Sequence, residues 1–101
     1  MPNDKKRVLA VDDDASVCEF YSEVLRLNGY DVECAPSAAK ARETLARRRP
    51  DIILMDIMMP DQDGISFTRE LRADTKTSDI PIIVISGLAD ARTLNDALLF
   101  G

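Results

Sequence analysis

The stretch DIILMDIMMPDQDG, residues 51–64, decides the fold. Its first part is an unbroken apolar run that stops abruptly at Asp56. Because polar and apolar residues do not alternate in this run, both faces of the predicted strand are expected to be buried, as in a parallel sheet. A loop over residues 57–63 then leads to Gly64, which opens a short helix with Ile65, Thr68 and Leu71 on one face.

The same arrangement occurs elsewhere in the chain. Residues 7–11, RVLAV, form a compact apolar run that halts at Asp12, Asp13 and Asp14. Residues 81–85, PIIVI, stop at the pair Ser86-Gly87, and residues 30–35 are also typical of a strand. We therefore predict four strands, of which three end at polar side chains.

Helical patterns separate these strands. Asp14 caps a first helix that Asn28-Gly29 ends, and Ser37 caps a second helix that Pro50 follows. A polar connection over residues 73–79 follows the third helix, and Asp90 caps a fourth. The residues at helical spacing are Val17, Phe20, Val24 and Leu27 in the first helix, Ala38, Ala41 and Leu45 in the second, and Ala91, Leu94, Ala97 and Leu98 in the fourth.

Strands that alternate with helices predict an α/β fold with a doubly wound parallel sheet, since crossover helices must cover both faces. In such a sheet, ligands bind beyond the carboxyl ends of the strands, at the point where the winding reverses. Asp12, Asp13, Asp56 and Ser86 follow or end predicted strands. We expect these four residues to share one edge of the sheet.

Composition limits the functions open to the chain. Its 101 residues suit one domain, 1–101, and a net charge of −5 argues against direct binding of nucleic acid. The chain has no histidine, so its chemistry is expected to depend on carboxylates. No apolar run is long enough for a signal peptide or a membrane span, and we predict a cytoplasmic protein with reduced, packed Cys18 and Cys34.

Carboxylates gathered at one sheet edge require a cation or protons. Each pair of like charges about 4 Å apart repels by roughly 4 kcal/mol at an effective dielectric constant near 20. Oxygen-only ligands favour Mg²⁺, with Mn²⁺ or Ca²⁺ as substitutes. A carboxylate beside such an ion can attack a phosphoryl group in line, which makes Asp56 a candidate nucleophile.

Three motifs together resemble the receiver domain of two-component response regulators: VLAVDDD at 8–14, DIILMDIMMPDQDG at 51–64 and PIIVISG at 81–87. The resemblance implies a flavodoxin-like fold with strand order 2-1-3-4. It also implies a metal site made by Asp12, Asp13, Asp56 and the backbone carbonyl of Met58, a phosphoacceptor at Asp56, a switch hydroxyl at Ser86 and a small residue, Gly87, beside it.

The family resemblance further implies a partner, namely a sensor histidine kinase or a histidine phosphotransfer protein that donates the phosphoryl group. It implies no enzyme with substrate turnover, but a self-phosphorylating acceptor at most. The region from the fourth strand to the fourth helix is expected to carry the signal outward.

The resemblance covers four strands and four helices, and the family's fifth strand and fifth helix have no counterpart up to Gly101. We therefore expect a receiver domain truncated after its fourth helix, without the lysine that the family places near the phosphoryl group. Loss of such a donor is expected to lower the phosphorylation rate by ~10²- to 10³-fold. The exposed edge of the fourth strand is expected to support a homodimer.

Three alternatives remain at this point. A receiver-like module that no longer accepts phosphate would act in protein interaction or dimerisation. Residues 59–70 approach a calcium-binding loop, but Met59 occupies its first position and a strand precedes it. Residues 61–64 also resemble the D-x-D-G signature of an aspartyl-phosphate phosphatase; we interpret Asp61 and Asp63 as solvated loop charges.

Overall fold

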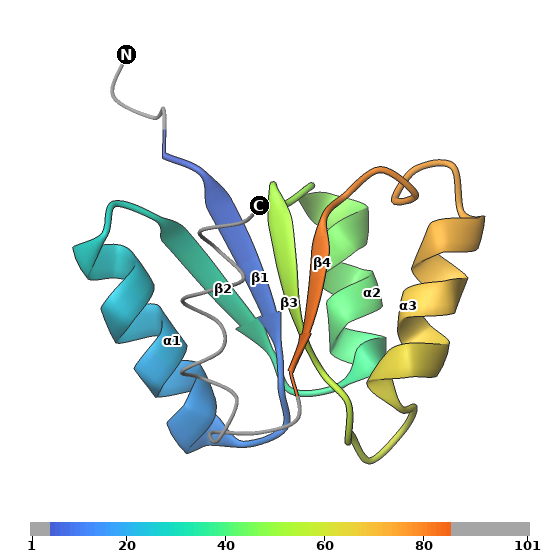
Figure 1. The fold of residues 1–101 in the computed structure, drawn as a ribbon, viewed down its shortest axis with the longest axis horizontal. Coiled ribbons are helices and arrows are strands. Elements are labelled where there is room, and N and C mark those ends of the chain that lie inside the picture. Colours follow the sequence, from blue (N-terminus) through green and yellow to red (C-terminus); the bar gives the residue numbers. More distant parts are fainter. Residues whose placement is uncertain (1–4, 86–101) are drawn as a thin grey trace.

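A computed structural model of the chain describes residues 5–85. Four parallel strands form one sheet in the order β2-β1-β3-β4 (Figure 1). The strands are β1 (Arg7–Val11), β2 (Asp31–Ala35), β3 (Ile52–Asp56) and β4 (Ile82–Ile85), and the helices between them are α1 (Ala15–Leu27), α2 (Ala38–Arg47) and α3 (Gly64–Ala73). The predicted parallel α/β sheet and its strand order are confirmed.

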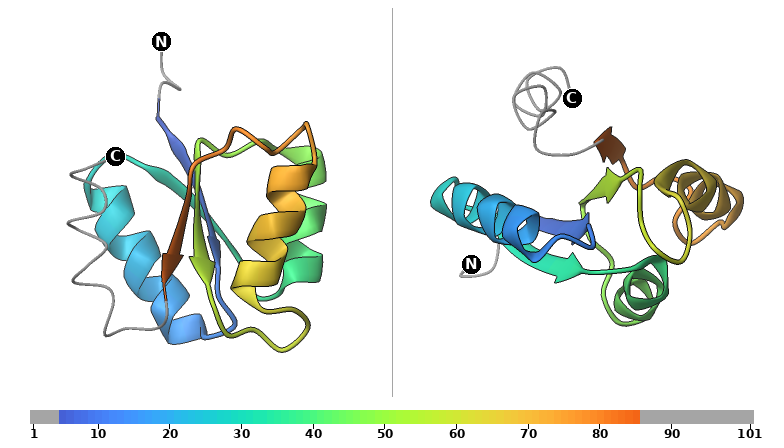
Figure 2. Two further views of the ribbon diagram at one scale, coloured as in Figure 1. Left: turned by 45° about the vertical axis from the view of Figure 1, so that its right-hand side comes forward. Right: turned by 90° about the horizontal axis from the view of Figure 1, so that it is seen from below.

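The helices cover both faces of this sheet. Figure 2 shows α1 on one side and α2 and α3 on the other. The chain runs from β1 outward to β2, then returns past β1 to β3, so the winding reverses between β1 and β3. This reversal point is where a doubly wound sheet places its ligand site.

Two apolar cores follow from the alternation of side chains along the strands. On the α1 face, Val8 and Ala10 of β1 pack with Tyr21 and Leu25 of the helix. On the opposite face, Leu9 and Val11 pack with side chains of α2 and α3, including Phe67, which is fully buried. Since each successive residue of β1 belongs to the other core, the strand is apolar throughout, as the sequence predicts.

The predicted helix starts are also observed. The Asp14 carboxylate accepts a hydrogen bond from the backbone N–H of Ser16 (2.9 Å), and the Ser37 hydroxyl accepts one from Lys40 (3.1 Å). After α1, Gly29 adopts a φ of 87°, the left-handed conformation that glycine reaches without strain. Both side-chain caps satisfy N–H groups that a helix leaves unpaired at its first turn.

The predicted apolar stripe of α1 is only partly right. Val17 is buried, but Phe20, Val24 and Leu27 are exposed. The buried face instead runs through Cys18, Tyr21 and Leu25. The helix carries apolar residues on two adjacent stripes, and spacing alone could not decide which of them faces the sheet.

The predicted face of α3 is also partly wrong, and some boundaries differ. Leu71 is buried, whereas Ile65 is exposed and Phe67 takes the inward place. β2, β3 and β4 each begin one residue later than predicted, and β3 includes Asp56 as its last residue. Ser86, Gly87 and the predicted fourth helix lie outside the described residues. No helix within residues 5–85 has the length and apolar character needed to cross a membrane.

Candidate functional site

Three carboxylates meet at the carboxyl end of the two central strands. Asp12 and Asp13 directly follow β1, and Asp56 ends β3, the strand that pairs with β1. One carboxylate oxygen of each residue lies within 4.8 Å of those of the other two. Asp12 is buried, Asp13 is exposed and Asp56 is partly buried. The parallel register thus gathers the three aspartates that the sequence singles out.

Backbone groups hold two of these carboxylates in place. Asp12 Oδ1 accepts a hydrogen bond from the backbone N–H of Asp14 (2.9 Å). Asp56 Oδ1 accepts a longer one from the backbone N–H of Met58 (3.4 Å). The main chain at residue 58 therefore lies beside Asp56, where its carbonyl is predicted to serve as a ligand. The remaining predicted site residue, Ser86, follows β4 just outside the described residues.

Burial and mutual repulsion oppose ionisation at this site. Burial and, after it, the neighbouring Asp12 carboxylate together raise the pKa of Asp56 to about 6. Burial also raises the pKa of Asp12, although the Asp14 N–H counteracts that rise. Among the described residues, no cationic side chain forms an ion pair with the three carboxylates. This is the electrostatic condition that a bound divalent cation would relieve.

Gly64 sets how closely α3 approaches the site. A Cβ atom at this position would lie 2.1 Å from the backbone oxygen of Asp56, far inside van der Waals contact. The Gly64 N–H also donates a hydrogen bond to the backbone oxygen of Ile57 (2.7 Å). The glycine is therefore needed for packing against the loop rather than for an unusual φ angle, which the sequence alone could not establish.

The interpretation of Asp61 and Asp63 as solvated loop charges is wrong in one respect. Both are exposed, yet Asp61 accepts hydrogen bonds from the backbone N–H groups of Ala38 (3.1 Å) and Ala39 (2.9 Å) at the start of α2. Asp63 caps α3 by accepting from Ser66 N–H (2.8 Å). These bonds attach the 57–63 loop to two helices. The D-x-D-G spacing thus reflects capping, which is a common use of aspartate before a helix.

A second cluster that the sequence analysis missed fastens α2 to α3 beside this loop. Arg42 forms an ion pair with Glu70 (2.7 Å) and donates a hydrogen bond to Gln62, while its guanidinium lies 5.0 Å from the centre of the Phe67 ring. Partners separated by 28 residues give no local sequence signal. Through Gln62, the cluster also contacts the 57–63 loop.

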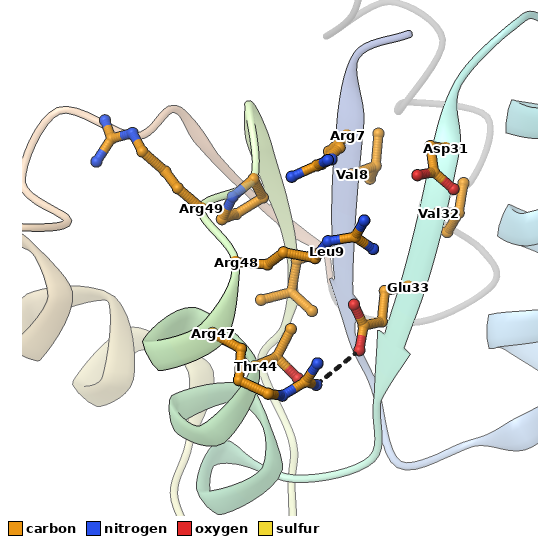
Figure 3. Close-up of a pocket in the computed structure, with 11 residues that line it drawn as sticks. Arg7, Val8, Leu9, Asp31, Val32, Glu33, Thr44, Arg47, Arg48 and Arg49 are labelled. Carbon is orange, nitrogen blue, oxygen red and sulfur yellow. Dashed lines mark hydrogen bonds and ion pairs between the residues drawn. The ribbon is translucent and has the colours of Figure 1, made fainter. Parts of the chain in front are cut away.

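A hollow of about 310 Å³ lies at the opposite end of the sheet (Figure 3). Its floor includes the buried residues Val8, Leu9 and Val32, and Arg7, Arg47, Arg48 and Arg49 stand around it. Arg47 pairs with Glu33 across it (3.1 Å). We place the chemistry at the three carboxylates instead, because guanidinium groups stay protonated and one of the hollow's two carboxylates is already paired.

Comparisons with known proteins agree with this geometry. Residues 8–101 match the family model of the response regulator receiver domain. Response regulator MprA of Mycobacterium leprae is 45% identical over 80 residues, which make up 79% of this chain and 34% of the relative. The chain therefore spans about a third of the length of the curated relatives that it matches.

Solved structures have the same fold. A sensor protein from Polaromonas sp. JS666 superposes with a TM-score of 0.79 and 37% identity, over 88% of this chain and 71% of that one. The signal receiver domain of a signal transduction histidine kinase from Syntrophus aciditrophicus gives a TM-score of 0.78 and 30% identity, over 95% and 73% of the two chains.

Proposed function

Because this chain belongs to the response regulator receiver domain family, we propose that it accepts a phosphoryl group on Asp56 in two-component signalling. The donor is a sensor histidine kinase or a histidine phosphotransfer protein. Asp12, Asp13 and Asp56, together with the backbone carbonyl of Met58, would hold Mg²⁺. Ser86 would read the modification. The domain acts as an acceptor that is modified once, without turnover of a substrate.

One observation carries the proposal, namely the convergence of three carboxylate oxygens within 4.8 Å at the winding reversal of the sheet. Capping explains Asp14, Asp61 and Asp63, each of which accepts backbone N–H bonds at a helix start. It does not explain a partly buried Asp56 that faces two like charges. A cluster of carboxylates in which burial and mutual repulsion disfavour ionisation is typical of a functional site.

The donor set fits a hard divalent cation. All three side chains offer carboxylate oxygens. Among the described residues, no cysteine or histidine belongs to this group. Bound Mg²⁺ would neutralise the charge on the transferred phosphoryl oxygens. Asp56 attacks the phosphorus through one carboxylate oxygen, and the donor's bond to phosphorus breaks on the opposite side. Asp12, held by the Asp14 N–H, keeps the cluster at the strand end.

Location and assembly remain part of this proposal. The protein would act in the cytoplasm, where its kinase partner holds the donor group. Two copies would pair through β4, since β4 pairs only with β3 among the described residues and a strand with one free edge can accept a second chain. The acidic net charge of −5 supports a protein partner over nucleic acid for this domain.

The test is intact-mass spectrometry after incubation with acetyl phosphate and Mg²⁺. We expect a single phosphoryl adduct on the parent and none on Asp56→Asn, which keeps the size of the side chain but removes the nucleophile. Asp51→Asn is the matched control, because Asp51 is an exposed residue that binds the backbone N–H of Arg7 at the other end of the sheet. No adduct on the parent would favour the interaction-module alternative.

A further inference from the structure

The two cysteines of the chain lie close together where α1 packs against β2. Cys18 lies on the buried face of α1, and Cys34 lies on β2 opposite Ala10 of β1. The Cys34 sulfur is 3.7 Å from the backbone oxygen of Cys18 and 3.7 Å from the hydroxyl of Ser22, one turn further along the helix. Both thiols are free. The packed, reduced cysteines that the sequence predicts thus form a pair.

The two thiols differ in accessibility and acidity. Cys18 is 9% exposed, whereas Cys34 is only partly buried. The neighbouring Cys18 side chain and, after it, the Ser22 hydroxyl together lower the pKa of Cys34 to about 7 against the effect of burial. A reachable thiolate is the form that peroxides oxidise, and a second thiol beside it can resolve the product.

We propose that Cys34 and Cys18 are a thiol-oxidation site for hydroperoxides and that oxidation joins α1 to β2 through an intramolecular disulfide. The Cys34 sulfur attacks the peroxide, the O–O bond breaks, and a sulfenic acid and an alcohol (water, from hydrogen peroxide) form. The Cys18 sulfur then displaces the hydroxyl, which leaves as water with the Cys18 proton. Both sulfurs are oxidised and the peroxide is reduced; a dithiol reductant reverses the bond.

The pair also contacts the backbone of the acidic site. The Cys18 thiol donates a hydrogen bond to the backbone oxygen of Asp12 (3.7 Å). The Asp12 N–H donates to the backbone oxygen of Ala35 (3.0 Å), the residue after Cys34. A disulfide removes the proton that Cys18 donates and pulls on both elements that flank Asp12. Oxidation should therefore reduce the Mg²⁺-dependent phosphoryl adduct, a consequence that rests on the proposed function.

The disulfide itself is tested without any phosphoryl donor. The intact chain is treated with hydrogen peroxide, blocked with N-ethylmaleimide and digested with trypsin without reductant. Trypsin cuts after Arg7, Arg26 and Lys40, so Cys18 and Cys34 fall in separate peptides, 8–26 and 27–40. We expect these two peptides as one cross-linked species that has lost two hydrogen atoms, and as separate peptides again after dithiothreitol.

Single variants separate the two sulfur roles. In Cys18→Ser, Cys34 should accumulate oxygen adducts without a cross-link, and in Cys34→Ser, the buried Cys18 should stay unmodified. Circular dichroism shows whether each variant folds, and the parent result does not depend on them. Separate peptides in the oxidised parent, or a cross-link only between two chains, would overturn the site. If the cross-link forms but the reduced parent gains no phosphoryl group, the proposed function fails and the oxidation site stands.

Discussion

At one end of the sheet like charges gather unpaired among the described residues, whereas at the other end opposite charges form ion pairs. At the carboxyl end, Asp12, Asp13 and Asp56 gather with no ion-pair partner among residues 5–85. At the other end, Arg47 pairs with Glu33 (3.1 Å), and Arg49 pairs with Asp79 (2.6 Å). Paired charges at a surface are typical of ordinary structure, whereas a cluster of unpaired like charges requires another explanation. Charged residues occur at both ends of the sheet, so their presence alone does not identify a functional site. Whether they form ion pairs does distinguish the two ends.

Substitution of a glycine at each end gives the largest expected difference. Gly64→Ala places a Cβ atom against the Asp56 backbone oxygen, at a distance of 2.1 Å before relaxation. Because that neighbour is main chain, we expect a loss of about 3 kcal/mol in the free energy of unfolding. Gly29→Ala meets no atom within 4 Å but must keep a φ of 87°, so about 1 kcal/mol is expected. Urea unfolding measures both, and equal losses would contradict the packing argument.

The second-largest difference between the two ends is expected when one carboxylate at each end is neutralised. Asp13→Asn removes a predicted metal ligand, and we expect Mg²⁺ affinity to fall by at least the ~10- to 100-fold that outer-shell substitutions cause. Glu33→Gln removes a carboxylate that is paired with Arg47 and should leave affinity unchanged. The increase in Tm with Mg²⁺ concentration reports the affinity. A Tm response of Asp13→Asn identical to that of the parent would remove this residue from the metal site.

The three carboxylates should also give the free energy of unfolding of the metal-free domain an unusual pH dependence. The pKa of Asp56 is about 6 in the folded state against an ordinary 3.8, so the folded chain holds this proton more tightly. Its contribution to stability is complete below about pH 4 and is lost as the pH rises through about 6. The full shift corresponds to about 3 kcal/mol, and partial exposure reduces our expectation to about 1–2 kcal/mol.

Thermal unfolding without metal between about pH 5 and pH 6.5 measures this effect. In that range the Cys34 thiol, with a pKa of about 7, stays largely protonated, and the exposed Asp61 and Asp79, whose pKa values are lowered by their hydrogen-bond partners, stay ionised. The parent should be less stable at the higher pH, and Asp56→Asn should show a flatter profile. Added Mg²⁺ should stabilise the parent more at the higher pH. A parent that gains stability as the pH rises would contradict the raised pKa.

The sequence predicts the scaffold and the site to different depths. Apolar runs that end at Asp12 and Asp56 suffice for the strands and for the shared edge, because parallel strands bring their carboxyl ends together. The inward face of α1 was not predictable, since Phe20 and Tyr21 are adjacent apolar candidates and packing decides between them. The capping of α2 by Asp61 was hidden as well, because its partners lie more than 20 residues away.

The smallest expected effect concerns the arginine end, where Arg49 and Asp79 form an ion pair with side chains that are 52% and 74% exposed. Solvent screens such pairs, so Arg49→Gln should lower the free energy of unfolding by less than about 1 kcal/mol. The lost hydrogen bond from Arg49 to the backbone oxygen of Lys76 adds little, because that oxygen is exposed to water. A double-mutant cycle with Asp79→Asn isolates the pair itself. A coupling energy well above 1 kcal/mol, or a loss of phosphoryl adduct in either variant, would show that this end does more than hold the strands and would undo the contrast between the two edges.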